Sequence, residues 1–290
     1  MINRRIFIRN SGLLALTVPL SKLPSYDLNA NMLSAFGIQL YMVRDAMEKN
    51  TPGTLKQLGQ MGYTQIESYS GSKGMFWGMS NVEFEKLAEK YGLSMVSSHY
   101  NDGDLSFDKQ AALAAEIGMK YLICPWKGPQ KSIDDFKRIA EDFNHRGSIC
   151  KKHGLRFAYH PHDYPYKKVD GEIPLNVLLD NTDEGLVDYQ MDFYYAVTEG
   201  QSPEAYFQKY KNRFKLCHLR DVLKQRLPVG DKDESACDLG QGIVDYPHLL
   251  NIAFKNGMEY FFVEQSRYFH ETEIQSAEVN ARYMKKLKLV

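Results

Sequence analysis

The sequence predicts a (β/α)8 TIM barrel, an α/β fold made of a single domain, preceded by a short export signal. The chain has 290 residues, which suits one barrel of about 250 residues with a leader. Short apolar runs alternate with helical patterns, and this alternation indicates parallel β/α units. The runs lie near residues 36–41, 63–69, 94–99, 119–125, 155–161, 187–193, 213–219 and 259–265. We therefore expect a signal segment at 1–30 and the barrel at 31–290.

The boundaries of the expected helices carry recurring signals. Several helical patterns end at a glycine, which can adopt the left-handed conformation that closes a helix. Helices begin at Thr51-Pro52 and Ser202-Pro203, where a capping side chain precedes a proline, and residues 80–83 read as a capping box. The closing glycines are Gly62, Gly92, Gly118, Gly154 and Gly257.

The composition excludes several classes of function. Lys and Arg total 36 and so do Asp and Glu, so the chain offers no basic excess for phosphate contacts and nucleic acid is not an expected partner. No stretch reaches the roughly 18 apolar residues that a membrane span needs. The cysteines form no Cys-x-x-Cys pair, and we expect none of them to be catalytic. They are Cys124, Cys150, Cys217 and Cys237.

The N-terminal segment differs in kind from the rest of the chain. Arg4, Arg5 and Phe7 lie in a pattern that resembles a twin-arginine export signal, and a weakly apolar stretch follows at 11–20. This pattern predicts export to the periplasm, with cleavage near Ala30. A basic tail without a targeting role is the alternative.

Polar residues recur with period two towards the ends of the expected strands. Barrel enzymes carry their chemistry on inward-facing residues at the carboxyl ends of strands. Taken singly, each of these residues could cap a loop or be a satisfied core residue. The longest connection, 222–243, is expected to lie over the same face. The residues are Gln39, Tyr41, Gln65, Glu67, Tyr69, Ser97, His99, Cys124, Trp126, His160, His162, Gln190, Asp192, Tyr194, His218, Arg220, Glu264 and Ser266.

The convergence of these residues predicts a divalent metal site. Burying Glu67, Asp192 and Glu264 together costs several kcal/mol per ion unless a cation compensates. Four residues from successive strands would meet at one point, and their mixture of imidazoles and carboxylates suits Mn²⁺, Co²⁺, Fe²⁺ or Zn²⁺. The expected metal ligands are His160, Asp192, His218 and Glu264.

Taken in order, these segments resemble the xylose-isomerase-like TIM-barrel superfamily, the sugar phosphate isomerase/epimerase group, from about residue 35 to the end. The resemblance implies a metal bound by residues from the last four strands, and Asp192, His218 and Glu264 match three of its ligands. His160 departs from the pattern, since isomerases and epimerases commonly have Glu there; its Tyr-His-Pro-His setting is more similar to the inosose dehydratase branch. The matching segments are 37–45, 62–67, 97–99, 159–163, 190–194, 217–221, 239–245 and 262–265.

A metal that binds a carbonyl and the adjacent hydroxyl eases removal of the proton between them. We first expect a sugar isomerase or epimerase acting on an unphosphorylated carbohydrate. A lyase or dehydratase that eliminates water or an aglycone from a keto-sugar or 3-keto-glycoside is the alternative. A non-catalytic sugar-binding barrel is a further alternative, and a metal-dependent endonuclease is disfavoured by the absence of basic excess.

The same patterns give candidates for the individual roles. The side chains expected to move protons, in order of preference, are Glu264, His162, Glu67 and His99. Aromatic walls and cationic groups could bind the substrate, and these candidates are Tyr41, Trp126, Lys127, Tyr194 and Arg220.

Overall fold

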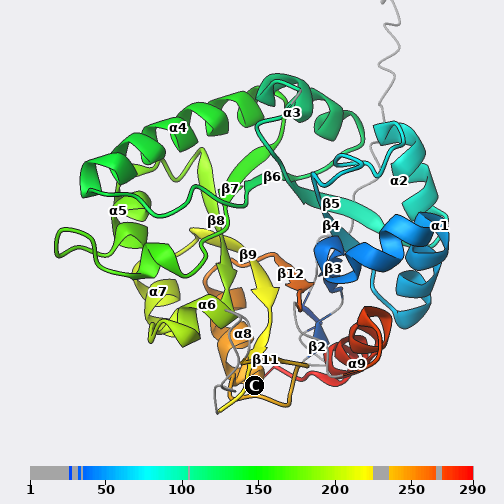
Figure 1. Cartoon of the computed structure of the whole chain (residues 1–290). Coiled ribbons are helices and arrows are strands. Elements are labelled where there is room, and N and C mark those ends of the chain that lie inside the picture. The colour runs from blue at the N-terminus through cyan, green and yellow to red at the C-terminus, as the bar shows by residue number, and fades with distance from the viewer. Residues whose placement is uncertain are drawn as a thin grey trace, which may run out of the picture.

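In the computed structural model of the chain, eight parallel strands close into a barrel that helices surround (Figure 1). The structure describes residues 26–27, 32–33, 35–103, 105–224, 235–265 and 270–289. The strand order around the barrel is β12-β3-β4-β5-β6-β7-β8-β9, so each strand pairs with its neighbour in the chain and the last closes on the first. The predicted signal at 1–30 lies outside the described residues, apart from β1 (Tyr26–Asp27).

Each barrel strand lies within one of the eight predicted runs. The strands are β3 (Gly37–Gln39), β4 (Gln65–Tyr69), β5 (Ser94–His99), β6 (Tyr121–Cys124), β7 (Arg156–Tyr159), β8 (Val187–Asp192), β9 (Phe214–Leu219) and β12 (Tyr260–Val263). The short strands β2 (Met32–Leu33), β10 (Asp221–Val222) and β11 (Ala236–Cys237) lie outside the barrel sheet. The predicted single α/β barrel is therefore confirmed.

Helices follow the strands and cover the outside of the barrel. They are α1 (Arg44–Met61), α2 (Asn81–Glu89), α3 (Phe107–Glu116), α4 (Ile133–Lys152), α5 (Pro174–Asn181), α6 (Phe193–Thr198), α7 (Pro203–Lys209), α8 (Tyr246–Lys255) and α9 (Glu273–Lys286), with 3₁₀ turns η1 (Leu40–Val43) and η2 (Tyr164–Tyr166). Within the described residues, no helix combines the length and apolarity needed to cross a membrane.

The capping residues and closing glycines predicted from the sequence are found at most of the predicted helix ends. Gly62 ends α1 with φ 98°, and Ser80 and Glu83 form the expected capping box of α2. A helical segment does begin at Thr51-Pro52: α1 as a whole starts at Arg44, but it consists of two helices joined across a kink at Asn50, whose backbone is non-helical. The side chain that caps the second one is Asn50 and not Thr51, since Oδ1 of Asn50 accepts from the backbone N–H of Gly53 at 3.0 Å. The proline thus begins the second half of a kinked helix, because its ring excludes a regular preceding turn.

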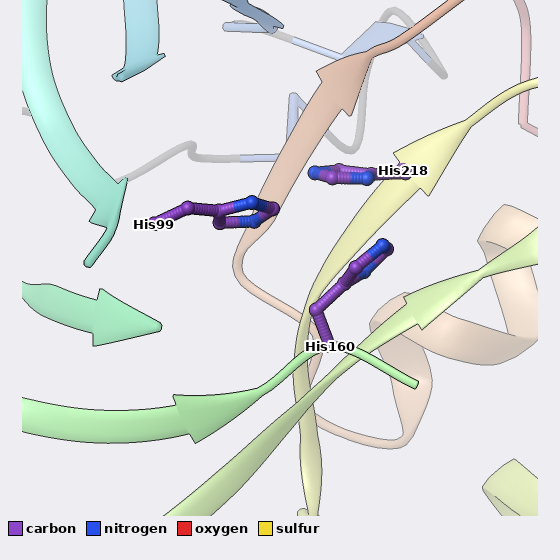
Figure 2. Close-up of side chains that lie close together, drawn as sticks. All are labelled: His99, His160 and His218. Carbon is purple, nitrogen blue, oxygen red and sulfur yellow. The ribbon is translucent and has the colours of Figure 1, made fainter. Parts of the chain in front are cut away.

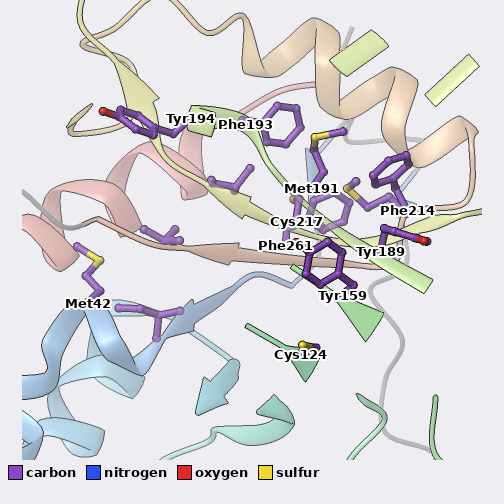
Figure 3. Packing of buried hydrophobic residues seen from close by; sticks show 14 of the residues in the cluster. Met42, Cys124, Tyr159, Tyr189, Met191, Phe193, Tyr194, Phe214, Cys217 and Phe261 are labelled. Carbon is purple, nitrogen blue, oxygen red and sulfur yellow. The ribbon is translucent and has the colours of Figure 1, made fainter. Parts of the chain in front are cut away.

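One apolar cluster packs outside the barrel strands, and a smaller one lies inside the barrel. The larger fills the space between barrel and helices, and Figure 3 shows part of it, including the ring contact of Tyr159 with Tyr189 at 6.2 Å between centroids. Cys124 belongs to this outer cluster, so the predicted inward orientation of Cys124 is wrong; the adjacent Ile123 belongs to the smaller cluster instead. All four cysteines are free and buried.

The smaller cluster forms the floor of the barrel beneath the polar residues. Its members include Ala158, Leu216 and Phe262, each of which lies two positions before a polar residue on the same strand face. Apolar side chains therefore occupy most of the lower positions, together with Gln65 and the ion pair of Asp188 with Arg156. The ligand-type side chains gather above them at the carboxyl ends of the strands.

The chain after β9 is fixed by one buried carboxylate. Asp221 accepts hydrogen bonds from the backbone amides of Val222, Gly240, Gly242 and Val244 at 2.8 to 3.1 Å. A Cβ at Gly242 would lie 2.2 Å from Oδ1 of Asp221, so the loop depends on glycine there. This anchors β10, β11 and the described ends of the long connection at the carboxyl end of β9.

Helix α4 packs closely against the backbone of Leu186 at Gly147, and a substitution of this glycine can test the contact. A Cβ at Gly147 would lie 2.6 Å from the carbonyl oxygen of Leu186. Gly147→Ala should lower the free energy of unfolding by about 1–3 kcal/mol through overpacking, although Ala is about 1 kcal/mol better than Gly in a helix. Urea denaturation measures the change. Ser148→Ala, on the exposed side of the same turn, is the control, and equal stability of both variants would contradict the close contact.

Candidate active site

Four ligand-type side chains converge at the carboxyl ends of β7, β8, β9 and β12. They are His160, Asp192, His218 and Glu264, and one ligand atom from each lies within 4.8 Å of the others. Nδ1 of His218 lies 2.9 Å from Oε2 of Glu264 and 3.9 Å from Oδ2 of Asp192. Nε2 of His160 lies 4.0 Å from the same Asp192 oxygen. The structure thus brings together all four residues that the sequence predicts as ligands.

The donor set fits a divalent cation. Oδ2 of Asp192 and Nδ1 of His160 are buried without a hydrogen-bond partner, and unpaired buried polar atoms are costly. Burial lowers the pKa of His160 well below its usual value, so that its imidazole is neutral and able to act as a ligand. Two carboxylates and two imidazoles suit a transition-metal ion or Zn²⁺.

A third imidazole, from β5, points towards the same region, and Figure 2 shows His99, His160 and His218 directed towards one another. Nε2 of His99 lies 3.0 Å from Oε1 of Gln190 and 3.2 Å from Oε1 of Glu67. Both neighbours are acceptors, so this nitrogen carries a proton and donates. The set that includes Asp192 therefore fits a cation better than the set of three histidines.

Glu67 lies beneath these ligands and is completely buried. Its carboxylate accepts hydrogen bonds from Gln39 at 2.9 Å, Ser97 at 2.7 Å and Gln190 at 2.8 Å. Nε2 of His218 donates to it at 2.6 Å. This bond fixes the ring of His218 so that Nδ1 faces the other ligands, the arrangement in which a carboxylate orients a metal-bound histidine.

The geometry of Glu67 favours a positioning role over the expected role of general base. Burial opposes its ionisation, but His99 and His218 outweigh burial and hold the pKa of Glu67 well below its usual range. Both oxygens are occupied, and the side chain does not line the cavity above the ligands. Glu67 is a positioning residue.

The cavity above the ligands has a volume of about 450 Å³. Aromatic side chains form its rim, with Tyr41 43% and Trp126 49% exposed. Its lining residues are Tyr41, Tyr69, Ser70, His99, Tyr100, Asn101, Pro125, Trp126, His160, His162, Tyr195, Arg220 and Glu264. Among them Arg220 is the one cationic side chain and Glu264 the one carboxylate.

Two residues expected to bind substrate lie outside this lining. Nζ of Lys127 lies 2.9 Å from Oδ2 of Asp142 on α4, so its charge is directed away from the cavity. Tyr194 is buried beneath Arg220, whose guanidinium lies 4.2 Å from its ring centroid. Neither Lys127 nor Tyr194 therefore lines the cavity.

Five lining residues were not predicted from the sequence, and for one of them, Tyr195, a signal existed. The five are Ser70, Tyr100, Asn101, Pro125 and Tyr195. The strand period of two selects Tyr194, but β8 ends at Asp192 and α6 begins at once, so the helical period applies. Oδ1 of Asp192 caps this helix by accepting from the backbone N–H of Tyr195 at 3.2 Å. An aspartate before an aromatic run is an N-cap signal that could have identified the change of period.

The charges at the site depend on one another. Burial disfavours the charged form of His218, but Glu264 and Glu67 outweigh burial and raise its pKa to about 10. Burial raises the pKa of Asp192 to about 6. Burial lowers the pKa of His162 to about 4, so this half-buried imidazole is neutral at pH 7.

Comparison with known proteins gives the family. The profile of the xylose isomerase-like TIM barrel family matches residues 55–287. The chain belongs to this family. The inosose dehydratase of Clostridium perfringens is 28% identical over 142 residues, 45% of this chain and 47% of the relative. Inosose dehydratase 2 of Bacillus cereus is 29% identical over 148 residues, which are 48% of this chain and 49% of the relative. The chain thus matches these relatives over about half of their length.

Solved structures agree with this membership. A sugar phosphate isomerase/epimerase from Parabacteroides distasonis is 25% identical, with a TM-score of 0.76 over 88% of this chain and 99% of the other. The structure of IOLI protein with a bound zinc atom has a TM-score of 0.69 at 15% identity, over 88% and 99% of the chains. The second likeness shows the shared fold alone.

The role assigned to Glu67 can be tested by metal binding. Glu67→Gln keeps the side-chain volume but removes the charge that orients His218. We expect binding of Zn²⁺ or Mn²⁺ to weaken about 10- to 100-fold, measured by isothermal titration calorimetry on protein stripped with a chelator. Ser97→Ala, which removes only one of the hydrogen bonds to Glu67, is the control and should have a smaller effect. Unchanged affinity of E67Q would refute the role.

Metal binding should also release a proton. Because the pKa of His218 is about 10 without metal, its imidazole is charged at pH 7 and a cation must displace that proton. The apparent affinity should rise about tenfold per pH unit between pH 7 and 9 and fall further below pH 6, where Asp192 becomes protonated. Calorimetry in buffers of different ionisation enthalpy counts the protons. Zero release at pH 7 would contradict the charge state of His218.

Proposed function

We propose that the protein is a divalent-metal-dependent lyase that eliminates water or an alcohol from a keto-sugar or keto-glycoside. The observation that carries the proposal is the scarcity of carboxylates in the cavity: in the described residues its lining includes only Glu264, and Glu264 belongs to the ligand set. A reaction that removes a proton with one carboxylate and returns it with another lacks its second group. Elimination requires one proton carrier near the substrate.

His162 is the side chain best suited to carry that proton. It lines the cavity, its imidazole is neutral at pH 7, and its ring centroid lies 4.6 Å from that of His160. The rings of Trp126 and Tyr195 pack against the imidazole of His162, with centroid distances of 4.8 and 4.9 Å, and these contacts limit its rotation. An imidazole held beside the ligand set can accept a proton from a bound substrate.

The elimination balances with the residues present. A bound divalent cation would polarise the carbonyl of the substrate. His162 takes the proton from the carbon next to that carbonyl, and the electron pair forms a double bond as the C–O bond at the next carbon breaks. The departing oxygen then receives the proton from His162, which returns to its neutral form. The products are an unsaturated keto-sugar and water or an alcohol.

Arg220 supports binding of the oxygen-rich substrate. The guanidinium lines the cavity and stacks on Tyr194 at 4.2 Å and Tyr195 at 5.4 Å. Its charge is therefore fixed at the edge of the ligand set, where it can bind hydroxyl oxygens and stabilise developing negative charge.

A sugar isomerase or epimerase is the second candidate. It shares the first step with the lyase, and the similarity to the Parabacteroides distasonis enzyme, which extends over nearly the whole barrel, favours it. The relatives named dehydratases favour elimination, as does an imidazole in place of a carboxylate at the end of β7.

The two reactions can be separated with the metal-loaded protein and 3-keto-glucosides in heavy water. Elimination gives free alcohol and a conjugated product that absorbs in the ultraviolet. Isomerisation or epimerisation gives deuterium in the remaining sugar without release of alcohol. Mass spectrometry and absorbance distinguish these outcomes, and deuterium incorporation without alcohol release would contradict the lyase.

The role of His162 can be tested in the same assay. His162→Asn should reduce turnover about 10²- to 10⁴-fold, the usual contribution of a proton carrier, while leaving metal content unchanged. Lys127→Met is the control, since Lys127 lies outside the cavity, and it should retain activity. An H162N variant with full turnover would exclude His162 as the proton carrier.

We also propose that the protein is exported to the periplasm, on the strength of Arg4, Arg5 and Phe7. Replacing both arginines by lysine should leave the full-length protein in the cytoplasm. Cell fractionation followed by N-terminal sequencing measures this, and an unchanged distribution would refute the proposal.

A further inference from the structure

A second cavity of about 360 Å³ adjoins the cavity above the candidate ligands (the catalytic cavity). It lies between the loops that follow β4 and β5 and lead into α2 and α3, two helices that are neighbours outside the barrel (Figure 1). Ser70 and Asn101 line both cavities. The side-chain amide of Asn101 donates to the carbonyl of Ser70 at 3.3 Å, so these residues form a shared rim. A ligand that fills the catalytic cavity can extend across this rim.

The charged and hydroxyl groups on one side of the second cavity are already paired. Nζ of Lys73 lies 2.9 Å from the carboxylate oxygen Oε2 of Glu48, and it also donates to the backbone carbonyl of Glu48 at 2.8 Å. The hydroxyl of Ser72 donates to the same carboxylate at 2.6 Å. This side therefore presents little net charge to a ligand, which disfavours phosphate or carboxylate as the occupant.

The amide donors on the other side are also engaged. Nε2 of Gln110 donates to the backbone carbonyls of Asn101 at 2.8 Å and Leu105 at 3.0 Å. A second sugar would need hydrogen-bond partners for its hydroxyls, and burying these groups without partners is costly. The engaged donors make a second sugar a poor match for this cavity.

Apart from Ser70 and three glycines, the remaining side chains of the lining are apolar, and most of them are partly exposed. Met75, Phe76, Met79, Leu105 and Leu113 contribute to it. Four large apolar side chains of the described chain are exposed, and three of them line the two adjoining cavities: Tyr41 and Trp126 in the first, and Leu105, 45% exposed, in the second. Methionine sulfur and aromatic rings attract one another, and an apolar surface gathered around a cavity is typical of a ligand site.

We propose that the second cavity binds an aromatic group attached to the sugar in the catalytic cavity, so that the substrate is an aryl glycoside. This assignment rests on the proposed function for the sugar itself. The aromatic group lies against Met79, Phe76 and Leu105, and after elimination it is the part of the substrate that leaves with the oxygen. Leu105 is 45% exposed, so this part of the cavity lies at the protein surface, where the leaving group can reach solvent.

Binding of unreactive probes tests the proposal without turnover. The probes are 4-nitrophenyl β-glucoside, methyl β-glucoside, cellobiose and free 4-nitrophenol, titrated by calorimetry and by saturation-transfer NMR. The aryl glucoside should bind at least tenfold more tightly than the methyl glucoside or cellobiose. Leu105→Asn should remove most of this difference and leave binding of the methyl glucoside unchanged. Ile243→Asn is the control, because Ile243 is 53% exposed but lines neither cavity.

The outcomes separate this proposal from the proposed reaction. Preference for the aryl probe that L105N abolishes supports the aromatic site even if no keto-glucoside is turned over, in which case the reaction alone fails. Equal affinity for all three glycosides overturns the aromatic site even if elimination is observed. Tighter binding of cellobiose assigns the cavity to a second sugar, and the absence of binding by both aromatic probes at millimolar concentration also overturns the proposal.

Discussion

The hydrogen bond between Glu67 and His218 is the interaction on which the rest of the site depends. A carboxylate buried at the centre of a barrel is costly, and this one is stabilised because β3, β5, β8 and β9 each supply a donor. Those donors come from strands that are far apart in the sequence, so closure of the barrel assembles them. In return, the fixed carboxylate sets which nitrogen of His218 faces the ligand set.

The arrangement of layers follows from this constraint. The apolar floor beneath the carboxylate keeps water away and strengthens its hydrogen bonds, while the cavity above remains open to a ligand. Between the two lies the set of possible metal ligands, where Oδ2 of Asp192 has no protein partner.

The sequence predicts the strands and the four candidate ligands because both follow a simple period. Inward residues two apart on β7, β9 and β12 include His160, His218 and Glu264, and a regular strand fixes their direction. The strand period of two does not predict Tyr195, because α6 begins directly after Asp192, the last residue of β8. It also says nothing about partners distant in the sequence, so the pairing of Lys127 with Asp142 and that of Glu67 with His218 become visible only in three dimensions. The second cavity lies between two loops, for which no periodic rule exists.

Asp192 uses its two oxygens for different tasks, and this has a consequence for how such a barrel can diversify. One oxygen faces the ligand set, while the other begins the helix that carries Tyr195 into the cavity wall. A replacement that altered the preference for one metal over another would also shift the wall against which the substrate packs. In the proposed enzyme, metal choice and substrate selectivity would therefore change together at this position, and a lineage that alters one must re-optimise the other.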